Sequence, residues 1–380
     1  MKILQVIQFF APQFGGTVNA VYNLSKELSK QGHDVTIITT DFGFNKDYST
    51  SIEEAGVQVV PFKCVFNWAS FLYSPSMKNW LNNNIMKFDV IHMHNFRSYQ
   101  NSAVCDYAIK HEIPYILHAH GSILQIFKKK SLKKLFDLIY GKKILKNAAK
   151  LIAVSDLEKE QYKEMGICES RIEKIPNGLV LKRYFNQDYD FRGSNNVITK
   201  SIVLYLGRKD HVKGIDFLIK SFQSFLDDYG DVTLIIAGPD CGNEKELVNL
   251  VKKLKIEDNV KFLGFIGDVC SAYKAADILV YPVRYEIFGL VPFEAILCGT
   301  PVIVTENSGC GEIIRAANCG YLVKYGEIED LKNKMIHMIT NPKIGEEFVE
   351  NGNKYIMNNL NWKNINENIE EVYASIKKPV

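Results

Sequence analysis

Two glutamates, Glu286 and Glu294, stand with seven residues between them directly after a strongly apolar run. Between them, Gly289 permits a tight turn and a close approach of the backbone to a ligand, and Pro292 suits the first turn of a helix. The free N–H groups and the positive dipole end of such a helix would face a phosphate. Glu294 would then accept hydrogen bonds from ribose hydroxyls, and Glu286 from the hydroxyls of a sugar. The spacing alone fits a helix-terminal charge and an exposed loop acid equally well.

Two cations, Arg208 and Lys213, follow another apolar run, Ile202–Leu206. Cations on such a loop are usually solvated. If they face the helix that starts near Gly289, they could neutralise the negative charge that grows on a departing diphosphate. Arginine offers a planar fork of donors for this purpose, and lysine a point charge.

Four histidines, His92, His94, His118 and His120, lie near the ends of two predicted strands. Strand alternation puts each pair on one face of its strand. Because no carboxylate or cysteine completes a ligand set at the usual spacings, we expect buried, hydrogen-bonded histidines and no metal site. The D-x-D segment 188–190 lies in a polar stretch, and we expect it to be solvated.

A pair of glycines, Gly15 and Gly16, ends the first apolar run, and Thr17 is the expected N-cap of the next helix. The glycines fit a tight turn or a place where the backbone approaches a ligand. The chain has neither a G-x-G-x-x-G fingerprint nor a P-loop, which disfavours a nicotinamide dehydrogenase.

Short β-rich runs alternate with helical patterns along the whole chain, which predicts an α/β fold with doubly wound parallel sheets. The pattern breaks at the polar segment 186–200, which we interpret as a linker. We therefore expect two Rossmann-like domains, 1–185 and 201–360, that face each other across a cleft, and a helix at 361–380 that packs back on the first. The expected strands are Lys2–Ile7, Asp34–Thr39, Val57–Pro61, Asp89–His92, Tyr115–Leu117, Lys150–Val154, Ile172–Ile175, Ile202–Leu206, Val232–Ala237, Val260–Leu263, Ile278–Tyr281, Pro301–Val304 and Tyr321–Val323.

Glu286 and Glu294 resemble the E-x7-E signature of the retaining glycosyltransferases of family 4, which have the GT-B fold. Further motifs occur in the order of that family: F-A-P-Q-F-G-G at 10–16, D-V-I-H-M-H at 89–94, I-P-N-G at 175–178, L-G-R at 206–208 with Lys213-Gly214, and G-T-P-V at 299–302 followed by Glu312. The resemblance spans roughly residues 3–325, and the ordered set is far more specific than any one motif.

The resemblance implies transfer of a sugar, with retention, from a nucleotide-sugar donor to a glycan or lipid-linked acceptor, with no metal or other cofactor. It places His120 on the histidine that contacts the transferring sugar, whereas the family usually has no histidine at the position of His118. It gives catalytic roles to His120, Glu286, Arg208 and Lys213. The implied donor-binding residues are Gly15, Gly16, Gly207, Gly238, Phe288, Gly289, Leu290 and Glu294. Three alternatives stay open: a two-domain phosphorylase, an epimerase, and a partner subunit that binds nucleotide sugar without catalysis.

The segment Lys128–Lys150 holds nine lysines and one acidic residue, Asp137. It fits a solvated helix face or a surface that meets anionic lipid; no nucleic-acid motif accompanies it. The chain has eight singly scattered cysteines and no apolar run of membrane-spanning length. We therefore expect a cytoplasmic protein with peripheral contact at the inner membrane face.

Overall fold

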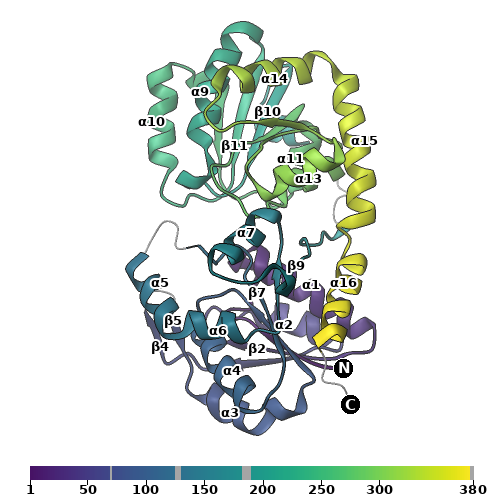
Figure 1. The fold of residues 1–380 in the computed structure, drawn as a ribbon. Helices are drawn as coiled ribbons and strands as arrows, with labels where there is room; N and C mark the ends of the chain where they lie inside the picture. Colours follow the sequence, from purple (N-terminus) through teal and green to yellow (C-terminus); the bar gives the residue numbers. More distant parts are fainter. Residues whose placement is uncertain (69–70, 125–129, 182–189, 377–380) are drawn as a thin grey trace. The chain divides into compact units, whose positions relative to one another are not determined.

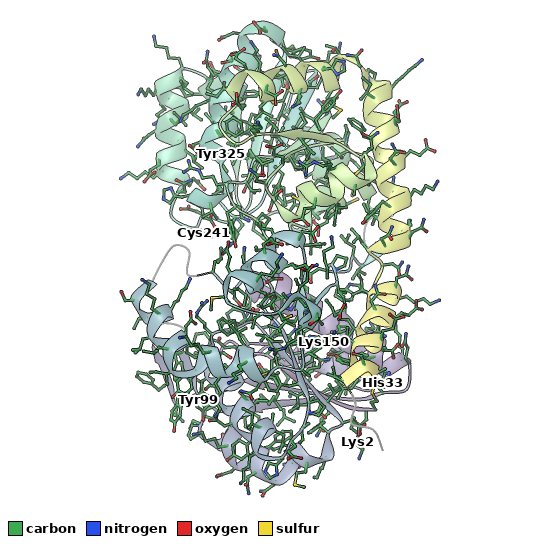
Figure 2. All side chains as sticks on the ribbon, viewed as in Figure 1. Lys2, His33, Tyr99, Lys150, Cys241 and Tyr325 are labelled. Atoms are coloured by element: carbon green, nitrogen blue, oxygen red, sulfur yellow. The ribbon has the colours of Figure 1, made fainter. Side chains whose placement is uncertain are left out.

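The computed structural model describes residues 1–68, 71–124, 130–181 and 190–376. The chain divides into two compact units (Figure 1): Met1–Gly178 with Trp362–Val380, and Leu179–Asn361. In each unit, side chains fill the space between a central sheet and the helices that cover it (Figure 2).

The first unit contains a seven-stranded sheet in the order β3-β2-β1-β6-β7-β8-β9, and every recorded pairing in it is parallel. The order reverses between β1 and β6, the point at which ligands bind beyond the strand ends in doubly wound sheets. Alternate residues of the strands enter two separate cores. Leu4 and Ile91 belong to one core, and Ile3 and Val90 belong to the other. The strands are β1 Lys2–Val6, β2 Asp34–Thr40, β3 Gln58–Phe62, β6 Val90–His94, β7 Tyr115–His118, β8 Lys150–Ala153 and β9 Ile172–Lys174.

Helices connect these strands, and a short antiparallel pair, β4 Phe66–Trp68 with β5 Phe71–Tyr73, lies outside the main sheet. The last helix, α16 Trp362–Ile376, returns to this unit and packs beside α1 (Figure 1). Its Tyr373 is fully buried and reaches the sheet residues Gln5 and His92. The other helices are α1 Gly16–Lys30, α2 Lys46–Glu53, α3 Ser76–Asn84, α4 Tyr99–Lys110, α5 Lys130–Phe136, α6 Lys142–Asn147 and α7 Asp156–Glu164.

A π-helical turn, Asp137–Gly141, joins α5 to α6. It turns Asp137 inward, where its carboxylate accepts two hydrogen bonds of 2.7 Å from the Arg97 guanidinium. The side chains that follow, Leu138, Ile139 and Tyr140, face outward and are exposed. The π-turn therefore buries the acidic residue of this segment and leaves its apolar residues on the surface.

The second unit contains a six-stranded sheet in the order β12-β11-β10-β13-β14-β15, again with every recorded pairing parallel. Its order reverses between β10 and β13. The strands are β10 Ser201–Leu206, β11 Val232–Ala237, β12 Val260–Leu263, β13 Ile278–Tyr281, β14 Val302–Thr305 and β15 Tyr321–Val323. The helices are α8 Phe191–Ser194, α9 Ile215–Tyr229, α10 Glu244–Leu254, α11 Val269–Ala275, α12 Val291–Leu297, α13 Gly309–Ala317, α14 Ile328–Thr340 and α15 Pro342–Asn359. The two sheets confirm the predicted fold class.

The segment 186–200 differs from the expected linker in its described part, which begins at residue 190. Phe191 starts the short helix α8 and is buried, and Arg192 donates to the carbonyl of Ala275. Asp190 caps α8 by accepting a hydrogen bond from the Gly193 N–H; this is the role that the structure gives to the described half of the D-x-D segment. Residues 190–200 therefore belong to the second unit, which begins at Leu179.

Candidate functional site

Most of the predicted residues of the second unit lie on two loops that leave neighbouring strands at the reversal of the sheet order. Gly238 follows β11, and Glu294 lies in α12. Gly207–Gly214 follows β10, and Pro282–Leu290 follows β13. Because β10 and β13 are paired in parallel, their carboxyl ends lie at the same edge of the sheet. Glu286 and Lys213 are therefore brought together although 73 positions separate them in the sequence.

Lys213 and Glu286 form an ion pair, with Nζ 2.5 Å from Oε2, and their side chains are only 9% and 21% exposed. Tyr281, the last residue of β13, donates its hydroxyl to the same carboxylate oxygen at 2.9 Å. The lysine also reaches the tyrosine oxygen at 3.4 Å. Since an ammonium has three donors, Lys213 can hold Glu286 and still donate to a ligand.

Burial and the neighbouring charges determine the protonation states of Glu286 and Tyr281. Burial alone would raise the pKa of the Glu286 carboxyl, but the charge and hydrogen bond of Lys213, the Tyr281 hydroxyl and the charge of Arg208 together lower it. Burial, with the charge of Glu286 next, raises the pKa of Tyr281 well above its ordinary value. At neutral pH, Glu286 is therefore an ionised hydrogen-bond acceptor, and Tyr281 is a protonated hydrogen-bond donor.

Arg208 is the exposed cation of this edge, with 62% of its side chain accessible and Asp210 at 3.5 Å. The buried Tyr205 hydroxyl donates to its carbonyl at 2.9 Å, which fixes the backbone and leaves the guanidinium free to turn. Arg208 is thus held in place by its main chain, whereas Lys213 is held by its side chain.

Between these two cations lies Lys209, a residue that the sequence did not single out. Its side chain is buried, and Nζ donates to the carbonyls of Gly238 and Leu263 at 2.5 and 2.8 Å and pairs with Glu244 at 2.8 Å. One ammonium therefore connects the loop after β10 with the loop after β11 and with the end of β12. Its only sequence signal is its position beside Arg208 in the loop.

Gly207 and Gly238 bring two of these loops into direct backbone contact. Gly238 has a φ of +128°, and a Cβ there would lie 2.1 Å from the Gly207 carbonyl oxygen. The glycine at 238 is therefore required by both conformation and space.

The Glu286 loop is anchored from the α13 side. The Gly309 N–H donates to the Glu286 carbonyl at 3.0 Å, and a Cβ on Gly309 would lie 1.8 Å from the Ile287 carbonyl oxygen. Thr305 donates its hydroxyl to the Val283 carbonyl at 2.7 Å. These contacts hold the carboxylate of Glu286 in place through its main chain.

Helix α12 begins at Val291 with Pro292 in its first turn, as the sequence predicts. Glu294 accepts a hydrogen bond of 3.0 Å from the Tyr273 hydroxyl and is partly exposed. The side chain of Phe288 is buried and packs near the Phe293 ring, so only its backbone can meet a ligand. Leu290 is the N-cap residue of α12.

The predicted glycines of the first unit lie at the start of α1. Gly15 has a φ of +87° and is the N-cap residue, and Gly16 is the first residue of the helix. The expected N-cap Thr17 is wrong: because the chain turns at Gly15, Thr17 already lies inside the first turn. A Cβ at Gly15 or Gly16 would meet nothing within 4 Å, so the surface beside both glycines is open.

His120 follows β7 and has a φ of +49°, which is unusual for a residue with a side chain. Its Nε2 shares a hydrogen bond of 3.0 Å with His94 Nδ1, and His94 donates its other nitrogen to Gln5 Oε1 at 2.6 Å. Burial, partly offset by a hydrogen bond with Asn177, lowers the pKa of His120 to about 3. His120 is therefore a neutral imidazole at physiological pH.

The turn after His120 depends on Glu158, another residue that the sequence analysis missed. This fully buried carboxyl accepts hydrogen bonds from the Gly121 and Val154 N–H groups at 2.5 and 2.9 Å. Burial raises its pKa to about 7. Glu158 thus fixes the turn that carries His120, and only its place on α7 near a strand end hints at this.

Two family models match successive parts of this chain: Glycosyltransferase Family 4 over residues 14–183 and Glycosyl transferases group 1 over residues 186–355. The chain is 26% identical to an uncharacterised glycosyltransferase of Methanocaldococcus jannaschii over 98% of both chains. It is 25% identical to a phosphatidyl-myo-inositol mannosyltransferase of Mycobacterium leprae, over 99% of this chain and 97% of that one.

Among solved structures, the Anabaena protein HepE in complex with UDP superposes with a TM-score of 0.82. It is 22% identical and covers 99% of this chain and 100% of its own. The likeness extends over both units, and both family models agree with the order of the sequence motifs. The chain belongs to the glycosyltransferases of family 4, of the group 1 type, and has their GT-B fold of two Rossmann-like domains.

Proposed function

We propose that this enzyme transfers a sugar, with retention of anomeric configuration, from a nucleotide-sugar donor to a hydroxyl of a glycan or lipid-linked glycan. The observation that carries the proposal is the group formed by Lys213, Glu286 and Tyr281, at the reversal point of the second sheet. It combines a cation for a diphosphate with an ionised acceptor for sugar hydroxyls. The complex of the Anabaena neighbour HepE with UDP-glucose supports a donor of this class.

In the proposed reaction, the acceptor hydroxyl attacks the anomeric carbon on the face that the diphosphate leaves. The bond to the diphosphate breaks, the new glycosidic bond forms, and the proton of the hydroxyl passes to the leaving phosphate. No residue of the chain serves as a covalent nucleophile. Glu286 and His120 orient the sugar, and Glu294 binds the ribose.

The leaving diphosphate would be stabilised by Lys213, by Arg208 and by the N–H groups at the start of α12. Preorganised charges of this kind often make the largest contribution to rate, because they need no rearrangement as the transition state forms. Lys213 suits the role because Glu286 and Tyr281 already hold it in position. We infer that no metal ion is required at this point, since two cationic side chains supply the positive charge.

The glycines would let the donor lie against the main chain. Gly207, Gly238 and Gly289 line the loops at this sheet edge, and Gly15 and Gly16 leave open surface at the start of α1. Phe288 and Leu290 would contribute through their backbone. We expect the base to be recognised near the Gly238 loop and residues 260–267.

We further propose that the enzyme works at the cytoplasmic face of a membrane and contacts anionic lipid through the α5–α6 segment. Its described part presents four exposed apolar side chains, Leu135, Leu138, Ile139 and Tyr140, beside four exposed lysines, Lys134, Lys142, Lys143 and Lys146. Asp137 adds no negative charge to this surface because it is buried against Arg97. Apolar residues among cations are typical of interfacial segments. Lys128 and Lys129 lie outside the described residues.

Among the described residues, no helix is both long enough and apolar enough to cross a bilayer. We propose a peripheral contact, and salt should weaken its electrostatic part. The mannosyltransferase relative from Mycobacterium leprae is named for a lipid acceptor, which supports an acceptor that lies in a membrane.

A thermal-shift panel of nucleotide sugars, with UDP- and GDP-linked donors side by side, tests the donor assignment. A donor that binds the folded chain but not the unfolded chain raises Tm, and the rise grows with the ratio of its free concentration to its Kd. We expect one nucleotide series to raise Tm, and transfer from the same donor to a glycan or lipid-linked acceptor to follow. If no nucleotide sugar shifts Tm and none is consumed, the proposal fails.

A further inference from the structure

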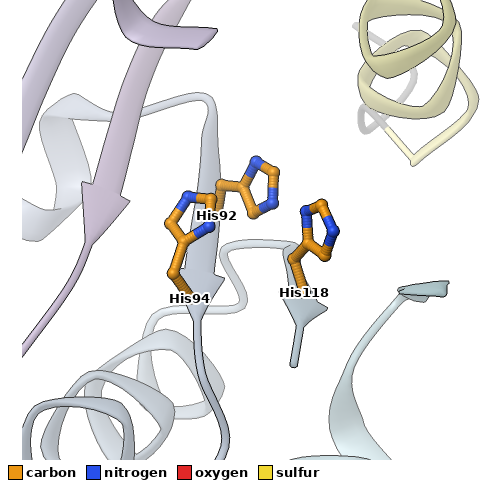
Figure 3. A group of neighbouring side chains, drawn as sticks. All are labelled: His92, His94 and His118. Atoms are coloured by element: carbon orange, nitrogen blue, oxygen red, sulfur yellow. The ribbon is translucent and has the colours of Figure 1, made fainter. Parts of the chain in front are cut away.

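Three histidines gather on one face of the first sheet. His92 and His94 stand two residues apart on β6, and His118 on β7 is the register partner of His94. All three side chains are buried, and each offers a nitrogen within 4.8 Å of the other two. Figure 3 shows the rings of His92 and His94 close together on their strand, with His118 on the neighbouring one.

The outer nitrogens of two of these rings already have oxygen partners. His94 Nε2 donates to Gln5 Oε1 at 2.6 Å, and His92 Nδ1 lies 2.8 Å from the Tyr373 hydroxyl. Metal-binding histidines almost always carry such a second hydrogen bond, because it fixes the tautomer and aims the other nitrogen at the ion. His92 Nε2 is then left without a partner among the described residues. His94 Nδ1 shares a hydrogen bond of 3.0 Å with His120 Nε2, and the ion would replace this hydrogen bond.

The remaining nitrogens point to a missing partner. Within the part of the chain that the structure describes, neither His92 Nε2 nor either nitrogen of His118 makes a hydrogen bond, although all are buried. A buried polar group without a partner is costly. A neutral imidazole must carry one N–H and one lone pair, so His118 leaves both unsatisfied. An ion that accepted these lone pairs would remove part of that cost.

We propose that His92, His94 and His118 bind one divalent transition-metal ion of the zinc type. Three neutral imidazoles without a carboxylate suit Zn²⁺, Co²⁺, Ni²⁺ or Cu²⁺ and not Mg²⁺ or Ca²⁺. The ion clamps β6 to β7 and, through Tyr373, supports the docking of α16. It has no part in stabilising the leaving diphosphate, so it is independent of the metal-free transfer proposed above.

The geometry needs a modest rearrangement of the rings. Zinc–nitrogen bonds of about 2.0–2.1 Å place tetrahedral ligand nitrogens about 3.3 Å apart, so the three rings must rotate to close their present separations. His92 and His94 are stacked with centroids 4.1 Å apart, and this stack would open. A water molecule takes the fourth position; His120 Nε2, 3.0 Å from His94 Nδ1, lies where it can hydrogen-bond that water.

The test uses the full chain, purified without a polyhistidine tag, stripped with chelator and then dialysed against Zn²⁺. We expect about one zinc ion per chain by elemental analysis, and Co²⁺ in its place should give the intense visible bands of a four-coordinate site. His118→Ala should weaken zinc binding by more than about 100-fold, because it removes a ligand and not merely a supporting group.

Two further variants make the assignment specific. Tyr373→Phe keeps the ring but removes the hydrogen bond to His92, so zinc should bind about 10–100-fold more weakly; this variant carries the test if His118→Ala does not fold. Cys270→Ala is the control, because Cys270 and Cys298, with sulfurs 3.1 Å apart, are the thiol pair most able to bind zinc instead.

Failure of the wild-type protein to retain zinc would overturn the proposal. Equal zinc retention by the wild type and His118→Ala, or loss of zinc in Cys270→Ala, would overturn it too. None of these measurements involves a nucleotide sugar. The zinc site can therefore be confirmed or refuted whether or not the proposed transfer reaction is correct.

Discussion

Lys213 and Glu286 are held 2.5 Å apart by loops that follow two paired strands, β10 and β13. Their opposite charges offset each other, and the Tyr281 hydroxyl donates a hydrogen bond to the same carboxylate. A diphosphate that takes a hydrogen bond from Lys213 therefore enters an already ordered group. In the proposed reaction, Lys213 would serve the leaving group while Glu286 serves the sugar.

Replacing Lys213 by methionine should abolish transfer and also destabilise the fold. Loss of one preorganised donor to the leaving group costs on the order of 10²–10³ in rate. Glu286 would be left buried without its cation, which costs about 3 kcal/mol of unfolding free energy. The double variant Lys213→Met/Glu286→Gln should regain most of the stability, because no uncompensated charge remains. It should regain none of the activity. Urea unfolding and donor turnover measure the two effects.

Lys163→Met is the matched control, since Lys163 forms an exposed ion pair with Glu160, and exposed pairs of this kind contribute little to stability. Near-normal turnover by Lys213→Met would contradict the catalytic assignment. A double variant no more stable than the single one would contradict the role of the buried charge.

Replacing Gly309 by alanine should displace the Glu286 loop. The new methyl group would lie 1.8 Å from the Ile287 carbonyl oxygen, so the backbone must move, at a cost of about 1–3 kcal/mol. We expect a lower Tm and weaker donor binding by calorimetry. Gly16→Ala, where a Cβ meets nothing within 4 Å, should leave Tm unchanged or higher. A Gly309→Ala variant with wild-type Tm and donor affinity would refute the anchoring role.

The fold was largely predictable because buried parallel strands are short apolar runs. The runs Val232–Ala237, Val260–Leu263 and Ile278–Tyr281 have the same bounds in the sequence analysis and in the structure. The start of α1 was not predictable, because Thr17 is a residue type suited to an N-cap and the sequence does not show the backbone turn at Gly15. The segment 186–200 was interpreted as a linker because Phe191, a buried aromatic in its described part, stands among polar residues.

Residue types and spacing were enough to name several residues of the candidate site, but they did not show which of these residues are in contact. Glu286 and Lys213 could be named, but that they form an ion pair depends on which strands are neighbours. Lys209 looks like another surface cation, and only the folded chain shows it buried against two carbonyls. Likewise, alternation groups His92 with His94, but the register of β6 with β7 is needed to add His118.

The stability of the fold should fall between pH 4.5 and 7 because of Glu158. Burial raises the pKa of this carboxyl from 4.5 to about 7, although the Val154 and Gly121 N–H groups act in the opposite direction. The folded chain therefore binds this proton more tightly than the unfolded chain does. Its contribution is complete below pH 4.5 and is lost as the pH rises through about 7, a total of about 3 kcal/mol.

Urea unfolding of the wild type and Glu158→Gln at pH 5, 6, 7 and 8 isolates this contribution, because the variant lacks the titrating group. We expect the difference in unfolding free energy between the two proteins to change across this range. Glu160→Gln, on the exposed side of the same helix, should follow the wild type. Parallel wild-type and Glu158→Gln curves would show that the raised pKa of Glu158 is wrong.

The exposed apolar residues of the α5–α6 segment should carry the proposed membrane contact. Leu138, whose side chain is 68% exposed, should enter the interfacial layer of an anionic bilayer while the neighbouring lysines meet its headgroups. Leu138→Glu/Ile139→Glu should therefore abolish sedimentation with anionic vesicles at low salt and leave Tm unchanged, since neither side chain is part of the core. Met86→Glu, at a position 73% exposed in the same unit, should sediment like the wild type. Wild-type protein that stays in solution with anionic vesicles at low salt, or sediments equally with neutral ones, would exclude the proposed contact.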